Sequence, residues 1–476
     1  MACTEELCYT KTAGTGKEKP YVIGEKAENL SKSKKYHFFT EEKQEKDCKN
    51  FANPPKNKIR NGGMDMAVIK PFCAIRPQAS KAAKIAALPY DVFTEEEARE
   101  EVKREPLSFL KIDRPETQFS RDTDIYSPQV YKRAQETLWK MLENGDFCQD
   151  VQKSFYIYEL KDGSHVQTGL VACASIDDYL NQVIKCHEKT RAEKEEDRIR
   201  HIEACQAQTG PIFLAHRPNP QLRRLLDIRK RSFPSYQFVA KDGISHRIWV
   251  VYEGNIIEKI EEIFRDVKEI YIADGHHRAA AAVKTGLERR RENPMYTGKE
   301  PFNYFMCVLF PSDELRILEY NRVVHSLNGL NSQDFLEKVK EHFEVKETGG
   351  IPMKPKRKGC FGMYLDKKWY HLKLKEEYVS RDAVEGLDVS VLQDYILGPV
   401  LGIREPRTDS RIEFIGGIKG LSPLMDQADR TGGVAFSLYP TDISELMQVA
   451  DEGRLMPPKS TWFEPKLRSG LFIHRI

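Results

Sequence analysis

The stretch from Glu269 to Glu288 constrains the fold more than any other part of the chain. Residues 269–274 are rich in β-branched and aromatic side chains, which predicts a strand. Gly275 follows and predicts a tight turn, because glycine adopts backbone conformations that other residues avoid. The alanines after Arg278 favour a helix and leave no bulk above its first turn. The sequence therefore predicts a strand, a one-glycine turn and a helix.

A helix that begins in this way can bind an anion at its first turn. Its unpaired N–H groups and partial positive charge suit a phosphate group above all. Arg278 adds a forked donor, and His276 and His277 add titratable ones. Asp274 adds a carboxylate at the end of the strand. The same residues also fit an ordinary corner whose polar side chains only cap and pair, and both interpretations stay open.

Composition narrows the class of protein. The net charge is +3, and the whole excess lies in residues 1–65, so bulk charge makes no case for nucleic-acid binding. The chain lacks an apolar run of the ~18–20 residues that a membrane helix needs. It also lacks the apolar core of a signal peptide, so a cytoplasmic location is expected. The ten cysteines are scattered without a Cys-x-x-Cys pair, which indicates reduced thiols.

The length of 476 residues allows two or three domains. Residues 1–65 are polar without an apolar period, which predicts a disordered N-terminal extension. Strands and helices alternate over residues 66–330, which favours a mixed α/β domain. A helix at 332–343 and a hairpin at 360–374 then predict a second α/β region over residues 331–476.

A dense charged segment runs from His187 to Arg198. At helical spacing its basic and histidine side chains, together with His201, would share one face. Such a face is usually a solvated stripe of i,i+4 pairs. The alternative is a face turned toward phosphate, to which His187, Lys194 and Arg198 would contribute.

Residues 88–92, Leu-Pro-Tyr-Asp-Val, form a rigid corner before a predicted helix. Thr94 fits the N-cap of that helix, and glutamates follow in its first turn. Helix capping explains Thr94, but it does not explain Asp91 on the corner itself.

The stretch from Pro457 to Lys466 places two lysines, two hydroxyls and a tryptophan among prolines. Such a composition suits a rigid loop that presents Lys459 and Lys466 to an anion. It suits equally a packed loop that Trp462 anchors.

Several common motifs are absent from the sequence. It has no Walker loop, no glycine-rich dinucleotide fingerprint after a strand, no His-Glu-x-x-His and no Gly-x-Ser-x-Gly. His276 and His277 are adjacent and would point in different directions, so they are not expected to bind one metal ion together, although one of them could bind alone; no metal-binding set of residues is predicted. A single aspartate together with nucleotide phosphates would suffice for Mg²⁺.

Five motifs in order resemble a bacterial family of unknown function, number 1015, whose members often carry the label SpoOJ/ParA/ParB/RepB-like. The motifs are Ile69–Phe72, Leu88–Val92, His187–Arg198, Ala273–Arg278 and Pro457–Lys466. The Asp-Gly-His-His-Arg turn is also similar to the ParB/sulfiredoxin superfamily. This resemblance implies a ParB/sulfiredoxin-like nucleotide-binding core, in which residues 275–278 cradle phosphate.

Three activities in that superfamily can be compared with the chain. Sulfiredoxins carry a cysteine before the His-Arg pair, where this sequence has His276. Partition proteins carry a helix-turn-helix after the nucleotide fold, and none is evident after Arg278. Free-serine kinases share the Asp-Gly-His-His-Arg form. The resemblance thus implies a phosphotransferase that acts on a small hydroxylated metabolite, with L-serine or O-phosphoserine the best guess. The alternative is a nucleotide-binding regulator or a ParB-like partition protein without catalysis.

The expected cofactor is a nucleoside di- or triphosphate (ATP, ADP or CTP) with Mg²⁺, and the expected partner is a small molecule, not nucleic acid or a membrane. The oligomeric state stays open. The candidate catalytic residues are Asp91, Asp274, His276 and His277. The candidate phosphate-binding residues are His187, Lys194, Arg198, Gly275, Arg278, Lys459 and Lys466.

Overall fold

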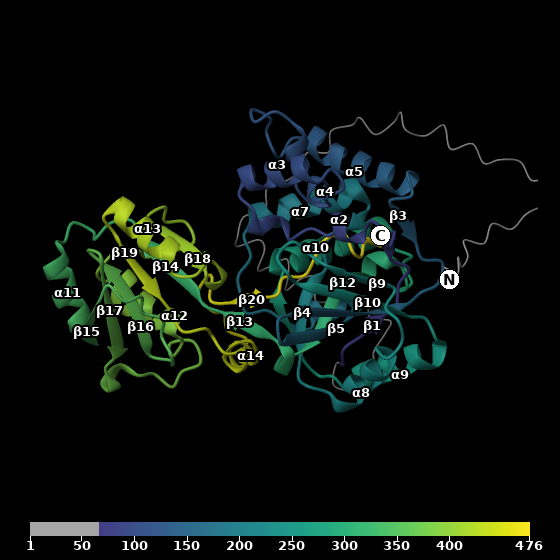
Figure 1. The fold of residues 1–476 in the computed structure, drawn as a ribbon. Helices are drawn as coiled ribbons and strands as arrows, with labels where there is room; N and C mark the ends of the chain where they lie inside the picture. Colours follow the sequence, from purple (N-terminus) through teal and green to yellow (C-terminus); the bar gives the residue numbers. More distant parts are fainter. Residues whose placement is uncertain (1–65) are drawn as a thin grey trace, which may run out of the picture. The chain divides into compact units, whose positions relative to one another are not determined.

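The computed structural model describes residues 66–476, which form a mixed α/β fold (Figure 1). The predicted fold class is therefore confirmed. The predicted N-terminal extension, residues 1–65, lies outside the described residues. Along the described part of the chain, no helix combines the length and the apolar character needed to cross a membrane.

The first sheet of the described chain has nine strands in the order β6-β11-β8-β12-β5-β4-β10-β9, with β1 paired to β5. β11 runs parallel to β6, and β12 runs parallel to β8. β4 and β5 form the predicted hairpin, which turns at Gly163 with φ of 56°. The strands are β1 (Ile69–Lys70), β4 (Phe155–Asp162), β5 (His165–Ser175), β6 (Ile184–Lys185), β8 (Ile212–His216), β9 (Tyr236–Val239), β10 (Ser245–Val251), β11 (Ile270–Asp274) and β12 (Tyr304–Pro311).

Both faces of this sheet are buried, which explains the nearly continuous apolar runs in β4, β5 and β12. Apolar side chains of α8, α9 and α10 pack on one face. Phe472 and other residues near the C-terminus pack on the opposite face. The helices around the sheet are α6 (Ile176–Leu180), α7 (Ala192–Cys205), α8 (Pro220–Arg229), α9 (Gly254–Arg265) and α10 (His276–Glu292).

A smaller helical cluster with its own apolar core lies between β2 and β4 in the sequence. α3 begins as predicted at Thr94, whose side chain and that of Glu97 form a reciprocal capping box. Phe109 and Phe147 meet edge-on in the core. The elements are β2 (Ile75–Pro77), α2 (Ala82–Ile85), η1 (Tyr90–Val92), α3 (Glu95–Arg104), α4 (Leu110–Asp113), η2 (Pro115–Gln118), α5 (Pro128–Glu143) and β3 (Phe147–Gln149).

The second sheet of the described chain has six strands in the order β15-β17-β16-β19-β14-β18. β16 and β17 form the predicted hairpin, and Asp366 and Lys367 at its turn both have positive φ. The strands are β14 (Tyr320–Val324), β15 (Phe343–Gly349), β16 (Cys360–Leu365), β17 (Lys368–Leu374), β18 (Ile412–Gly416) and β19 (Val434–Ser437). The accompanying helices are α11 (Ser332–Lys340), α12 (Asp388–Leu392), the π-helical turn η6 (Gln393–Leu397), α13 (Ser422–Thr431) and α14 (Ile443–Asp451).

The C-terminal residues return to the earlier part of the chain. β20 (Trp462–Glu464) pairs with β13 (Arg316–Leu318), and β21 (His474–Arg475) pairs with β7 (Ala207–Gln208). Ile473 also forms a bridge with Ile75. From the sequence, these residues are expected to belong to the second α/β region. The proposed division into 66–330 and 331–476 stays a prediction.

Candidate functional site

The predicted strand, turn and helix are β11, Gly275 and α10. Gly275 has φ of 93° and ψ of 31°, a left-handed conformation that favours glycine. A Cβ atom here would lie 3.1–3.2 Å from the guanidinium of Arg278. Gly275 therefore serves two purposes: it makes the turn, and it lets the Arg278 side chain fold back over the start of the helix.

Arg278 is held in place by the backbone that enters β8. Its Nη1 donates a 2.6 Å hydrogen bond to the carbonyl of Pro211. With Arg198, Tyr90 and other residues it lines a cavity of about 30 Å³. That volume suits roughly two water molecules. The cavity lies beside the first turns of α10, where Arg278 and Ala282 line it.

Asp274 forms an ion pair with Lys466, whose Nζ lies 2.9 Å from Oδ2. Burial by itself raises the pKa of Asp274, but the charges of Lys466 and Arg278 hold that pKa well below its ordinary value. Burial likewise lowers the pKa of Lys466, and the charge of Asp274 raises it beyond the ordinary value. The pair is charged at neutral pH, and it joins β11 to the C-terminal segment.

Lys459 and Asp91 interact electrostatically with the pair that Asp274 and Lys466 form. Lys459 has φ of 58°, and its Nζ lies 5.5 Å from the centroid of the Tyr320 ring. Burial lowers the pKa of Lys459, but Tyr320, Glu188, Asp91 and Asp274 together raise it above its ordinary value. Asp91, exposed on η1, also acts on the pKa of Lys466. The two lysines and the two aspartates that the sequence predicts for the site therefore interact electrostatically with one another.

His276 is the first residue of α10 and is buried against His187. The two ring centroids are 4.5 Å apart and the rings are nearly perpendicular. Burial lowers the pKa of His187 to about 3 and that of His276 to about 4. Both imidazoles are therefore neutral at physiological pH.

His277 points to a different neighbour. Its Nε2 accepts a 3.0 Å hydrogen bond from the backbone N–H of Arg191, the residue before α7. Burial lowers its pKa, and the carboxylates of Glu188, Glu195 and Asp91 act in the opposite direction. His277 thus ties the loop before α7 to the start of α10.

The segment from His187 to Arg198 is a loop followed by a helix, so the prediction of one continuous helical face is wrong. β6 pairs with β11 in an extended conformation, and α7 begins only at Ala192. His187 is consequently placed by the loop and not by the helix. The pairing with β11 is a non-local contact that helical spacing does not contain.

Arg198 is buried on α7, where it pairs with Asp197 at 2.8 Å. Its guanidinium also lies 4.2 Å from the centroid of the Tyr90 ring. Lys194 is half-buried on the same helix. No hydrogen bond or ion pair joins the Lys194 side chain to other described residues. The structure thus brings Arg198 next to Arg278 at the shared cavity, and it does not link Lys194 to them.

Glu188 is a residue that the sequence reasoning did not single out. It is half-buried beside His187, and a ligand atom of its side chain lies within 4.8 Å of those of His187 and His276. The adjacent His-Glu pair after a short apolar strand was the available signal. Interpretation of the whole segment as one helix hides this pair, because it places His187 and Glu188 on different faces.

The fold and this turn define a mixed α/β protein with a cation-lined helix start. The chain belongs to the family described as "Protein of unknown function (DUF1015)", whose model matches residues 69–390. No curated protein matches the chain. The family match confirms the resemblance to family 1015, and it carries no statement about ParB or sulfiredoxin.

The solved structures that are similar to the chain include the following three. A free serine kinase in complex with ADP is 16% identical, with a TM-score of 0.32, covering 62% of this chain and 87% of that one. SbnI with a C-terminal truncation, from Staphylococcus aureus, is 12% identical, with a TM-score of 0.35, covering 63% and 85%. A conserved hypothetical protein from Pyrococcus furiosus is 15% identical, with a TM-score of 0.31, covering 63% and 93%. These values are too low to define a substrate or a reaction here.

Proposed function

We propose that the protein is a nucleotide-dependent phosphotransferase that acts on a small hydroxylated metabolite, with free L-serine the best candidate. The start of α10 carries the proposal, because Gly275 opens a helix N-terminus with Arg278 folded over it and Lys466 beside it. Helix N–H groups together with fixed cations are what a phosphate chain requires. Membership of the ParB/sulfiredoxin superfamily stays a prediction that would agree with this site.

In the proposed reaction, the serine hydroxyl oxygen attacks the terminal phosphorus of the nucleotide. The bond from that phosphorus to the bridging oxygen breaks, and the hydroxyl proton passes to a carboxylate. The products are O-phosphoserine and the nucleotide shortened by one phosphate, and the same groups serve the reverse direction. Catalysis of this kind depends mainly on position and charge.

The contacts divide the candidate residues among these tasks. Asp274 is occupied by Lys466, so we assign it to anchoring that lysine. Asp91 and Glu188 are the better candidates for proton acceptor, because no hydrogen bond or ion pair with other described residues occupies their carboxylates, and both act electrostatically on Lys459. Lys459 would close over the transferred phosphate. Asp91 together with phosphate oxygens would hold Mg²⁺.

The predicted roles of Arg198 and Lys194 receive less support. Arg198 is already paired with Asp197 and stacked on Tyr90. We therefore assign Arg198 to the cavity that it lines with Arg278, and we leave Lys194 as an unlinked candidate.

The direct test uses the pure full-length protein with Mg²⁺ and L-serine, offered ATP, ADP and CTP in turn. ³¹P NMR and mass spectrometry would follow O-phosphoserine. The reverse reaction would start from O-phosphoserine and a nucleoside mono- or diphosphate. We expect turnover with at least one nucleotide. Absence of turnover with every nucleotide in both directions would remove the proposal.

A thermal-shift screen identifies the nucleotide independently of turnover. One nucleotide should raise the Tm of the wild-type protein, and Arg278→Ala should abolish that shift. Arg430→Ala on α13, where the arginine is exposed, is the matched control and should keep it. A nucleotide shift without any turnover would favour the nucleotide-binding regulator.

A further inference from the structure

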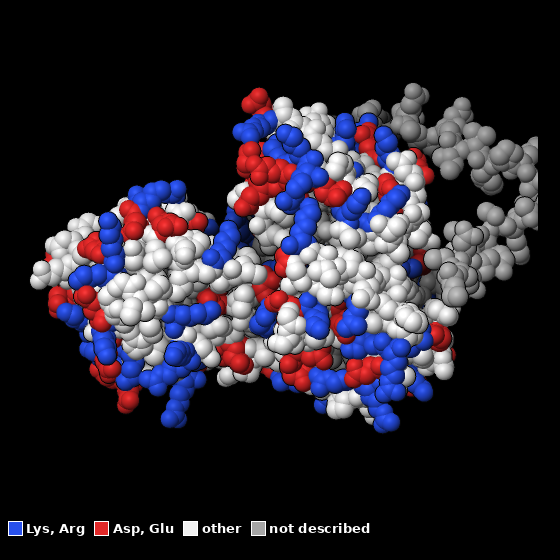
Figure 2. All heavy atoms as spheres, in the orientation of Figure 1, with Lys and Arg blue, Asp and Glu red and all other residues white. Residues whose placement is uncertain are grey.

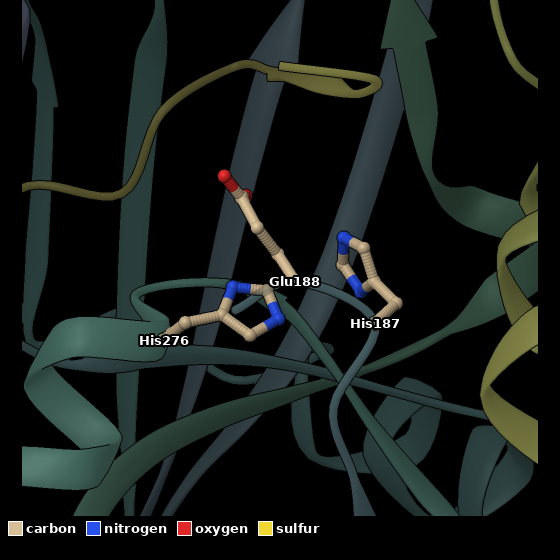
Figure 3. A group of neighbouring side chains, drawn as sticks. All are labelled: His187, Glu188 and His276. Carbon is tan, nitrogen blue, oxygen red and sulfur yellow. The ribbon is translucent and has the colours of Figure 1, made fainter. Parts of the chain in front are cut away.

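Three side chains with metal-ligating atoms converge beside the start of α10. They are His187 and Glu188, from the loop after β6, and His276, from the first turn of the helix. One potential ligand atom from each lies within 4.8 Å of the other two. Figure 3 shows the two imidazoles side by side, with the side chain of Glu188 rising next to them.

The two histidines each have a ring nitrogen that needs a partner. Nδ1 of His187 and Nε2 of His276 are buried, and neither has a hydrogen-bond partner among the described residues. His187 is 2% exposed and His276 is 7% exposed, so bulk water does not supply one. An unsatisfied buried polar atom is costly, and native structures seldom keep two side by side.

The unpartnered nitrogens indicate which atoms would bind the ion. Nδ1 of His187 and Nε2 of His276 are the ring nitrogens left without a hydrogen-bond partner among the described residues. His277 stays outside the group, because its Nε2 is bound to the N–H of Arg191.

We propose that His187, Glu188 and His276 bind one divalent first-row transition-metal ion, with Zn²⁺ the best fit. Two imidazole nitrogens and one carboxylate are a frequent ligand set for zinc with a fourth position open. The set does not suit Mg²⁺, which prefers oxygen ligands. Ligand atoms of tetrahedral zinc lie roughly 3.4 Å apart. The three ligand atoms, which lie within 4.8 Å of one another, would therefore draw closer on binding the ion.

The position of the ion would add to the proposed function. His276 belongs to the helix turn that is assigned to phosphate, so the open coordination position would accept a phosphate oxygen. This part of the inference rests on the proposed function, whereas metal binding does not. The sequence does not predict this set of metal ligands, because the expectation for a metal site rests only on the adjacent residues His276 and His277.

The test is a Zn²⁺ titration of the full-length, chelator-treated protein by isothermal calorimetry. We expect one equivalent bound and a raised Tm. Glu188→Gln and His276→Gln each remove a direct ligand, so each should weaken the affinity by more than the about 10–100-fold that loss of an outer-shell partner costs. Glu193→Gln, an exposed glutamate in the first turn of α7, and His371→Gln on β17 are matched controls that should bind as the wild type does.

Thiols are a competing source of zinc binding, so Co²⁺ replaces Zn²⁺ in a second measurement. Binding to the three proposed residues predicts a visible spectrum without a thiolate charge-transfer band. Such a band, equal affinity in both variants, or no binding would overturn the inference. If His276→Gln fails to fold, the nearly isosteric Glu188→Gln decides the question alone.

One further experiment separates this inference from the proposed function. Arg278→Ala should keep Zn²⁺ affinity while it loses the nucleotide shift in a metal-free buffer. Loss of zinc binding in Glu188→Gln with no nucleotide effect in any variant would support the metal site and contradict the phosphotransferase.

Discussion

Lys466 carries the charge that decides how Asp274 behaves. Its ammonium lies 2.9 Å from the carboxylate and, with Arg278, keeps the pKa of Asp274 well below its ordinary value. A general base works best when its pKa is near the working pH. Asp274 is therefore a poor proton acceptor and a good anchor. A chemical base in this site has to come from a neighbouring carboxylate, which is Asp91 when Glu188 binds a metal ion.

The pKa of Asp388, a buried carboxylate at the start of α12, is shifted in the opposite direction. Its Oδ1 accepts a 2.9 Å hydrogen bond from the N–H of Gly359, while its Oδ2 is buried without a partner among the described residues. Burial raises its pKa to about 7, with Gly359 and Lys358 acting against the rise. The folded state therefore holds a proton that the unfolded chain releases near pH 4.

This difference predicts a specific dependence of stability on pH. The stabilising contribution of protonated Asp388 is complete below about pH 4 and is lost as pH rises toward about 7. The loss amounts to at most about 4 kcal/mol in the free energy of unfolding. Asp388→Asn should remove this component, so urea unfolding at pH 5 and pH 8 should differ less in the variant. An unchanged pH dependence would contradict the prediction.

At the scale of elements, β11, Gly275 and α10 were predictable because each signal is local. β-branched and aromatic residues, one glycine and a run of alanines specify the unit. The capping box of α3 was predictable for the same reason. The beginning of α7 was not, because β6 is fixed by a parallel partner about 85 residues away in the sequence. Glu188 was missed together with that boundary.

Gly275→Ala tests the double purpose of the turn. A non-glycine residue in the left-handed region costs about 1–2 kcal/mol of stability. Here the added Cβ would also displace the guanidinium of Arg278, and nucleotide affinity should fall about tenfold, as expected for one lost charge-assisted hydrogen bond.

The matched control for this variant is Gly243→Ala, between β9 and β10. Gly243 has φ of 83°, and no heavy atom lies within 4 Å of the place that an added Cβ would take. The control should lose similar stability in chemical denaturation and keep its nucleotide shift. Equal nucleotide affinity in both variants would contradict the assigned role of Gly275.

At the scale of the whole described chain, residues 462–476 connect elements that are far apart in sequence. Leu471, Phe472 and Ile473 are fully buried. Phe472 lies with its ring centroid 5.2 Å from that of Tyr156 on β4. The loop with Lys466 was expected to serve the site, and its lysine does reach Asp274. Its return to the first sheet could not be predicted, because pairing partners of short strands leave no local pattern.

The packing of Phe472 predicts a large effect on stability. Phe472→Ala should lower the free energy of unfolding by about 3–5 kcal/mol through the lost contacts and the cavity. Phe233→Ala, where the side chain is 100% exposed, should change it by less than about 0.5 kcal/mol. Urea denaturation of both variants would measure the difference. Similar losses in the two would show that the C-terminal packing contributes little.

Surface charge at the same scale is mixed in sign. Figure 2 shows Lys and Arg interspersed with Asp and Glu on the face in view, without one field of a single sign. This agrees with the balanced charge of residues 66–476. The cations that matter for the proposed function are therefore those at the start of α10, and not a broad electrostatic surface.

The ion pair between Asp274 and Lys466 also has a consequence for biosynthesis. Its two residues are 192 positions apart, and the ribosome makes Asp274 first. At roughly 5–20 residues per second, Lys466 is added about 10–40 seconds after Asp274. A nascent chain that stops short of Lys466 would therefore lack one cation of the site. Ligand capture should begin only once the segment that carries Lys466 has reached Asp274.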